Sequence, residues 1–174
     1  MEAFMFRTFL LGLVGLIAST TAGAADEERM NAVYERFIAA YAALDVDLLM
    51  TAYDDDAVYL RSGEAAPAIG EPEIRASYNA FFGHVRNDGE RMRISFRIID
   101  RKMTDELASD VGYYRLERIA ADGTEIGAFY GRFLTVLAPQ SDGERAFAND
   151  LDTTANAELW EAAKPVKGAM FAAS

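Results

Sequence analysis

The sequence predicts an α+β fold in which three N-terminal helices pack on one face of a curved antiparallel sheet. Apolar residues repeat with a helical period up to about residue 87 and with a period of two beyond it. The later segments are long and are joined by Asp-Gly turns at residues 122–123 and 142–143, which is typical of a meander of strands. Curvature would turn the covered face of the sheet into a cone with a pocket at its mouth.

The helical part of the pattern contains three segments. Residues 26–44 form the first, and Asp45 is a suitable N-cap for a short second helix that the acidic triplet 54–56 ends, before a strand at residues 57–60. Pro72 suits the first turn of the third helix. The expected inner faces consist of Met30, Val33, Tyr34, Phe37, Ile38 and Tyr41, and of Ile74, Tyr78, Phe81, Phe82 and Val85.

Four strands are expected in the second half, at about residues 91–98, 107–119, 126–138 and 145–153. The third of them carries apolar side chains at both parities, so it needs cover on both faces. Helices can cover one face. A second subunit is the natural cover for the other, which predicts a homodimer formed through the sheet.

The ends of the chain are expected to lie outside the folded domain, which we place at residues 26–155. The tail, residues 156–174, should contain one short helix around Leu159 and Trp160 and continue as a loose segment from residue 165. Residues 1–24 resemble a secretory signal peptide, with Arg7, an apolar run and small residues that end at Ala24. The run is too short for a stable membrane anchor, so we expect a periplasmic or secreted protein.

The composition removes several classes of chemistry. A net charge of −11 argues against nucleic-acid binding, because phosphate contacts would form against the protein's own field. The absence of Cys excludes disulfides, thiolate nucleophiles and Cys-ligated metals, and a single His excludes multi-His metal sites. We therefore expect no metal and no cofactor. Carboxylate, Tyr, Arg and Lys chemistry, or binding alone, remains.

Several segments together resemble the NTF2-like superfamily. Residues 36–41 (RFIAAY), 44–49 (LDVDLL) and 53–59 (YDDDAVY) are similar to its opening helices and first strand, and residues 131–137 (GRFLTVL) to a late strand. The resemblance is closest to the SnoaL-like branch and to the branch called domain of unknown function 4440. It spans residues 28–153 and implies the helix-capped cone. It implies no single function, because this fold hosts enzymes, transport factors and oligomerisation domains.

The chain departs from the ketosteroid isomerases that share this fold. Those enzymes use a Tyr on the first helix and an Asp after the first strand, and the aligned positions here are Phe37 and Arg61. Phe cannot donate a hydrogen bond and Arg cannot accept a proton, so the isomerase mechanism does not transfer. Where the branch often has a His before the Asp of its final strand, this chain has Asn149.

Asp150 and Asp152 are the candidate catalytic residues. They are two positions apart on a predicted strand, so both carboxyl groups project from one face. If that face lines the cone, mutual repulsion raises one pKa and creates an acid/base pair. If it is the outer face or the rim, the two carboxylates are solvated and have no chemical role.

The aromatic residues are numerous enough to line a cavity rather than only to fill a core. A buried Tyr hydroxyl needs a partner, so several hydroxyls that converge would suit a hydrophobic ligand with a few polar atoms. Ordinary core packing with the hydroxyls at its edge is the alternative. The ligand-binding candidates are Tyr34, Phe37, Tyr53, Tyr59, Tyr78, Phe82, Tyr113, Tyr130 and Asn149.

Three functions remain open from the sequence. The first is an exported domain that binds a small hydrophobic or polar-aromatic molecule in its cone. The second is a SnoaL-like acid/base enzyme, an isomerase, cyclase or dehydratase, that uses Asp150 or Asp152 with a Tyr of the pocket. The third is a dimerisation or interaction scaffold whose cone is filled by its own side chains.

Overall fold

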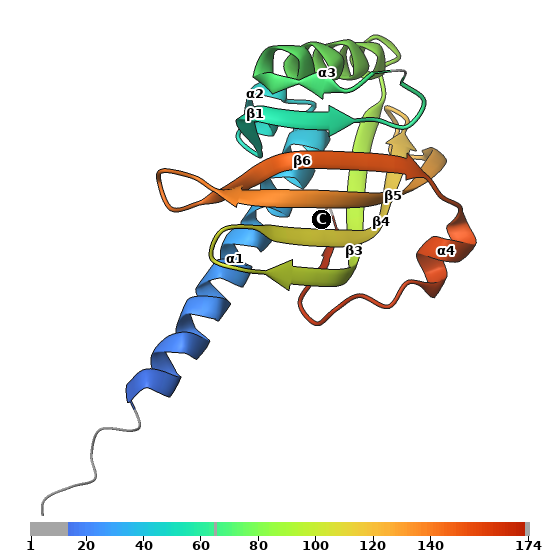
Figure 1. Cartoon of the computed structure of the whole chain (residues 1–174). Helices are drawn as coiled ribbons and strands as arrows, with labels where there is room; N and C mark the ends of the chain where they lie inside the picture. The colour runs from blue at the N-terminus through green and yellow to red at the C-terminus, as the bar shows by residue number, and fades with distance from the viewer. Residues whose placement is uncertain (1–13, 65, 173–174) are drawn as a thin grey trace, which may run out of the picture.

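The computed structural model describes residues 14–64 and 66–172 and has the expected α+β architecture (Figure 1). Three helices precede most of the sheet, and one short helix lies between its last two strands in the chain. The helices are α1 (Val14–Ala43), α2 (Val46–Met50), α3 (Gly70–Asn87) and α4 (Ala157–Ala162). The strands are β1 (Tyr53–Leu60), β2 (Ala68–Ile69), β3 (Arg91–Met103), β4 (Ala108–Ile119), β5 (Glu125–Pro139), β6 (Arg145–Thr154) and β7 (Met170–Ala172).

The strands form one sheet in the order β2-β1-β6-β5-β4-β3-β7. All neighbours are antiparallel except β1 and β6, which run parallel and bring the first strand beside the last long one. The helices α1 and α3 lie against the concave face, and the core sits between them and the sheet. The sequence prediction of a helix-capped curved sheet is confirmed.

Local signals account for several boundaries. The side chain of Asp45 accepts a hydrogen bond from the backbone N–H of Leu48 at 3.1 Å and so caps α2 as expected. Gly123 and Gly143 have φ of 91° and 87° in the two hairpin turns, a conformation that Gly adopts without steric cost.

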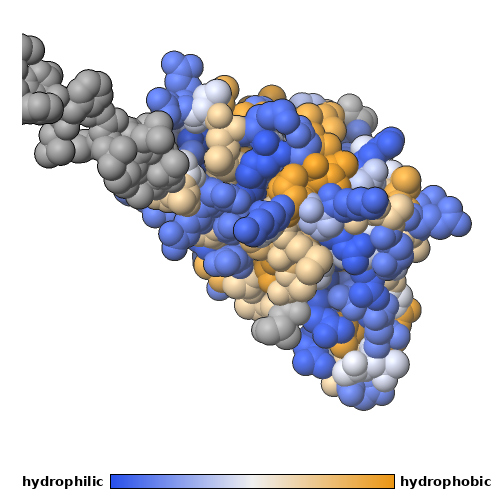
Figure 2. Space-filling model, turned by 90° about the horizontal axis from the view of Figure 1, so that it is seen from below, coloured by the Kyte–Doolittle hydropathy of each residue, from blue (hydrophilic) through white to orange (hydrophobic). Residues whose placement is uncertain are grey.

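Seen from below the view of Figure 1, the surface has patches of apolar residues between polar ones (Figure 2).

Two boundary predictions are wrong. The triplet 54–56 belongs to β1 instead of ending α2. Its carboxylates can stay in solvent there, because β2 pairs only with Val58 and Tyr59 and leaves the first part of β1 uncovered. The segment from residue 165 is not loose throughout. Met170–Ala172 pairs with β3 as β7, since Phe171 is buried against the core and its ring stacks on that of Tyr34.

The predicted signal peptide falls partly outside the described residues, because these begin at residue 14. Residues 14–24 form the first part of α1, which extends beyond the sheet (Figure 1). Within residues 14–64 and 66–172, no helix has both the length and the hydropathy needed to cross a membrane. Export stays a prediction.

Candidate functional site

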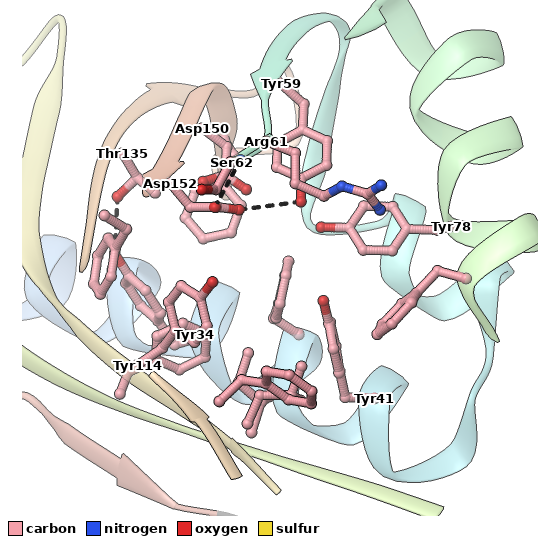
Figure 3. Close-up of a pocket in the computed structure, with 18 of the residues that line it drawn as sticks. Tyr34, Tyr41, Tyr59, Arg61, Ser62, Tyr78, Tyr114, Thr135, Asp150 and Asp152 are labelled. Atoms are coloured by element: carbon pink, nitrogen blue, oxygen red, sulfur yellow. Dashed lines mark hydrogen bonds between the residues drawn. The ribbon is translucent and has the colours of Figure 1, made fainter. Parts of the chain in front are cut away.

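The concave face of the sheet and the helices over it enclose a cavity of about 390 Å³. Rings on α1, α3 and the strands make up most of its wall, and polar atoms come mainly from the end of β1 and from β6 (Figure 3). The predicted residues that line it are Tyr34, Phe37, Tyr59, Tyr78, Asp150 and Asp152.

Periodicity explains why these side chains converge. Tyr34, Phe37 and Tyr41 follow one another at helical spacing on α1, so all three face the sheet. On β6, side chains alternate between the two faces of the sheet, so Asp150 and Asp152 point inward while Asn149 and Leu151 point outward. The two carboxyl groups therefore share one wall of the cavity, as the first alternative for this pair requires.

Asp150 is the more buried of the two carboxyl groups, with a residue exposure of 8%. Its Oδ2 accepts a hydrogen bond from the Tyr53 hydroxyl at 2.6 Å, and the Tyr53 and Tyr78 hydroxyls are 3.0 Å apart. Burial raises the pKa of Asp150 to about 7, the bond from Tyr53 opposes that rise, and the charge of Asp152 adds to it. Asp150 therefore changes its charge close to neutral pH.

Asp152 has more hydrogen-bond donors around it. Its Oδ1 accepts from the backbone N–H of Ser62 at 3.0 Å, and its Oδ2 from the Tyr59 hydroxyl at 3.3 Å. Burial raises the pKa of Asp152 too, while these two hydrogen bonds and the positive charge of Arg61 oppose the rise. Arg61 lies at the rim, where its guanidinium forms an ion pair with Glu64. Asp152 is thus the more readily ionised member of the pair.

The tyrosine hydroxyls near the carboxyl groups remain protonated at neutral pH. Burial is the largest cause that raises the pKa of Tyr41, Tyr53, Tyr59 and Tyr78 above the ordinary value of 10.0. These phenols can donate and accept hydrogen bonds without carrying charge. The wall thus combines neutral donors with two titrating acids.

A second polar group lies farther along the cavity. The hydroxyls of Tyr34 and Thr135 are 2.9 Å apart, and both residues line the space. Behind them, Arg101 binds both carboxylate oxygens of the fully buried Asp110 at 2.8 Å and donates to Asn31 at 2.7 Å. Because that ion pair is complete and does not line the cavity, we assign it a structural role.

A glycine makes room for one of the aromatic residues. Gly131 lies opposite Tyr114 in the β4–β5 ladder, and a Cβ at this position would come within 2.2 Å of the Tyr114 ring. The ring of Tyr114 therefore lies over the backbone of Gly131, and Tyr114 contributes to the cavity wall. A side chain at residue 131 would push that ring out of place.

Some sequence-predicted site residues lie elsewhere. Tyr113, Tyr130 and Asn149 are on the opposite, convex face, because strand alternation turns them away when Tyr114, Gly131 and Asp150 face the cone. The expectation that these three residues line the cone is wrong. Tyr53 and Phe82 are buried in the wall but do not line the cavity, and Tyr53 acts through its hydrogen bond to Asp150.

The structure also adds residues that the candidate set lacks. Tyr41 was recognisable as part of the inner face of the first helix, and Arg61 from its alignment with the isomerase Asp. Tyr114 and Thr135 required the strand register, and Ser62 required the parallel pairing of β1 with β6. Within the described part of the chain, no group of three or more His, Asp or Glu residues could hold a metal ion.

Comparisons with solved structures identify the same fold. An NTF2-like protein with a cystatin-like fold from Novosphingobium aromaticivorans is 15% identical, with a TM-score of 0.68 over 85% of this chain and 96% of that one. A protein from Catenulispora acidiphila in complex with S-DNPA is 21% identical, with a TM-score of 0.61 over 75% and 94%. A ketosteroid isomerase-like protein from Erwinia carotovora atroseptica is 16% identical, with a TM-score of 0.58 over 72% and 93%.

The comparison with curated proteins finds no match. The family model for the SnoaL-like domain matches residues 30–143, which include α2, α3 and the strands β1 to β5. Of the two branches that the sequence resembles, this is the one that the comparison supports. The chain belongs to the SnoaL-like domain family, and its fold is similar to that of solved NTF2-like proteins.

Proposed function

We propose that this chain binds a small, largely apolar molecule in its cone and holds one polar group of that molecule against the wall formed by Tyr59, Asp150 and Asp152. The observation that carries the proposal is the cavity of about 390 Å³, which is lined by aromatic rings and contains two inward-facing carboxyl groups. Ligand sites of small molecules commonly have volumes of roughly 300–1,000 Å³ and few polar groups.

Binding can be tested with a panel of apolar compounds that begins with 1-naphthol, which has a flat apolar body and one hydroxyl. We expect the ligand to raise the melting temperature, since binding to the folded state alone contributes about 2.7 kcal/mol at a hundred times the dissociation constant. Leu116→Trp should abolish the shift by filling the cavity, because Leu116 lines it. The matched variant Leu107→Trp, at an exposed position before β4 that does not line the cavity, should keep the shift.

The binding proposal predicts that at least one class of compound in the panel stabilises the protein. If no class raises the melting temperature, or if Leu116→Trp and the parent protein respond alike, the cone does not act as a ligand site. The third function, a scaffold without a ligand, would then be the better account.

A second candidate function is acid/base catalysis, and the state of Asp150 favours it. A carboxyl group with a pKa of about 7 in an aromatic site matches what a general base needs at neutral pH. For an enolisable ketone, Asp150 would take the proton from the α-carbon while a Tyr hydroxyl donates a hydrogen bond to the developing enolate oxygen. Return of the proton from Asp150 restores the carboxylate.

Proton abstraction can be measured as exchange of the α-protons of 2-tetralone for deuterium in D₂O, followed by NMR. We expect the protein to accelerate exchange and Asp150→Asn to lose the acceleration, with Asp152→Asn as the comparison within the pair. Equal exchange with the parent protein and with Asp150→Asn would remove the base from this mechanism.

We propose export with cleavage after Ala24, as the N-terminal pattern indicates. The proposal fits the contacts of the first mature residues. Asp26 accepts hydrogen bonds from two of the three guanidinium nitrogens of Arg145, Nε at 2.8 Å and Nη2 at 2.7 Å, and cleavage after Ala24 would leave that pair intact. Mass spectrometry of protein produced from the full chain in an exporting host tests the site, and a retained leader contradicts the proposal.

We propose a homodimer through the convex face of the sheet. One apolar row crosses four strands there, because Leu60 pairs with Leu151, Leu151 with Leu134, and Leu134 with Val111. The three leucines are 36–43% exposed. On β1, β6, β5 and β4, the residues around this row include no Asp or Glu, although the chain carries −11: Val58, Ser109, Tyr113, Tyr130, Arg132, Val136, Asn149 and Thr153. On β3, Asp100 lies opposite Val111 on this face and forms an ion pair with Lys102.

Self-association of an acidic chain is favoured at a face with few unpaired carboxylates, since the two copies carry net charge of the same sign. We expect light scattering to give twice the chain mass and Leu134→Arg to give the monomer mass. Met170→Arg, at an exposed position of β7, is the matched control and should remain a dimer. A monomeric parent protein contradicts this proposal without bearing on the cavity.

A further inference from the structure

We infer that the ligand of the cone is an organic cation: an ammonium or quaternary ammonium group on an apolar body, held between the carboxyl groups of Asp150 and Asp152 and the tyrosine rings that face them. The inference rests on the proposed binding function and adds the chemical class of the ligand. It is carried by the partners that the two carboxyl groups lack and by the kind of wall that surrounds them.

Within the described ranges, the two carboxyl groups have no ion-pair partner, and Arg61 is the cationic residue beside them. Neither Asp150 nor Asp152 forms an ion pair with any residue in the described ranges, and the nearby guanidinium of Arg61 is paired with Glu64 instead. Among residues 14–64 and 66–172, no group donates a hydrogen bond to Oδ1 of Asp150, and this oxygen is open to the cavity. Buried carboxylates are normally paired, so this wall lacks one positive charge.

The opposite walls are of the kind that binds cations. The rings of Tyr59 and Tyr78 stack at 5.5 Å between centroids, and the Tyr41 ring meets Tyr78 edge-on at 6.2 Å. Figure 3 shows the hydroxyls of Tyr41 and Tyr78 directed into the space in front of the carboxyl groups. Aromatic faces attract cations, and aromatic cages recognise quaternary ammonium groups.

The spacing of Asp150 and Asp152 allows one cation to contact both carboxyl groups. Residues two apart on a strand are separated by about 7 Å, so an ammonium group between Asp150 and Asp152 would lie within reach of both. An anionic ligand would instead meet two carboxyl groups and would have to displace Glu64 from Arg61. The net charge of −11 also favours the approach of cations over anions.

Binding of a cation should be coupled to proton release. In the empty cone the pKa of Asp150 is raised by burial to about 7, and a positive charge nearby would lower it. If the cation requires the ionised carboxylate, its affinity should be about tenfold higher at pH 8 than at pH 6. The titratable or charged groups that face Asp150 are Tyr41, Tyr53, Tyr59, Arg61, Tyr78, Tyr114 and Asp152.

The deciding experiment compares two probes of the same shape. Benzyltrimethylammonium and neopentylbenzene differ only in a charged nitrogen in place of a carbon, so the difference in their affinities isolates the charge. Titration calorimetry at pH 6 and pH 8, in buffers of different ionisation heat, gives the affinities and the number of protons released. At pH 8 we expect the cation to bind at least tenfold more tightly than neopentylbenzene. Its binding near pH 7 should release part of one proton.

Variants locate the effect. Asp150→Asn and Asp152→Asn should each reduce the affinity for the cation at least tenfold and leave that for neopentylbenzene unchanged. Asp55→Asn removes the same charge from an exposed position of β1 and should change neither. The comparison of probes on the parent protein requires no variant, so it stands even if one of these variants fails to fold.

The outcomes separate this inference from the binding proposal. Equal binding of the two probes, or tighter binding of neopentylbenzene, overturns the inference and leaves the binding function in place. Failure of both probes overturns the inference as well, and the panel that begins with 1-naphthol then decides whether the cone binds any ligand.

Discussion

Replacement of Asp150 by Asn should make the protein more stable, and increasingly so as the pH rises. The pKa of Asp150 is about 7 in the folded protein against an ordinary value of 3.8. The folded state therefore holds a proton that the unfolded state has lost between these values. Stability from this group is present below pH 3.8 and is lost as the pH rises through 7.

The size of the effect follows from the two pKa values. Each unit of pKa difference corresponds to about 1.4 kcal/mol, so Asp150 should cost the parent protein about 4 kcal/mol of unfolding free energy between pH 4 and pH 8. Asn cannot ionise, so the variant escapes this loss. The free-energy difference between Asp150→Asn and the parent should then move in favour of the variant by about this amount.

The assay is urea unfolding at several pH values, followed by circular dichroism. Asp122→Asn is the control of opposite sign, because backbone and side-chain hydrogen bonds from Thr124 lower the pKa of Asp122. Replacement of Asp122 should therefore reduce the unfolding free energy more at neutral pH than at acid pH. A stability difference for Asp150→Asn that does not change between pH 4 and pH 8 would refute the assignment of a buried, proton-holding carboxyl group.

The packing of the site gives two further predictions. Gly131→Ala should lose about 1–3 kcal/mol and weaken ligand binding, because the added Cβ displaces the Tyr114 ring; Gly127→Ala has open space around it on the same strand and should do neither. Urea unfolding measures the stability and calorimetry the ligand binding. Equal effects at the two glycines would contradict the role of Gly131 in making room for the Tyr114 ring. Phe171→Ala should lose about 3–5 kcal/mol by the same unfolding assay, whereas Met170→Ala, at a position 66% exposed, should change little; a neutral Phe171→Ala would mean that β7 adds nothing to the core.

Periodicity was sufficient for most of the fold. The helical spacing of α1 and α3 and the alternation in β3 each depend on residues close in sequence, and the structure confirms these elements. The pairing of β1 with β6 and the docking of β7 on β3 depend on contacts between residues that are far apart in the sequence. No local pattern indicates them, so β7 was expected to be loose and the start of β1 was misplaced.

The candidate site shows the same division. That Asp150 and Asp152 share a face follows from their spacing, but which face it is depends on the register of β6 with its neighbours. Where two adjacent residues are both Tyr, as at 113 and 114, parity alone cannot choose the inward one. The register decides it, because Tyr114 lies opposite Gly131, which leaves space for its ring.

The stacking of Phe171 on Tyr34 has a practical consequence for handling the protein. The two rings lie 5.3 Å apart at an interplanar angle of 9°, and Tyr34 is itself part of the cavity wall. An affinity tag fused directly after this strand, or a truncation before it, would disturb the backing of that wall and alter the site under study. A tag inserted in the exposed hairpin at Asp142 and Gly143 would leave both termini native.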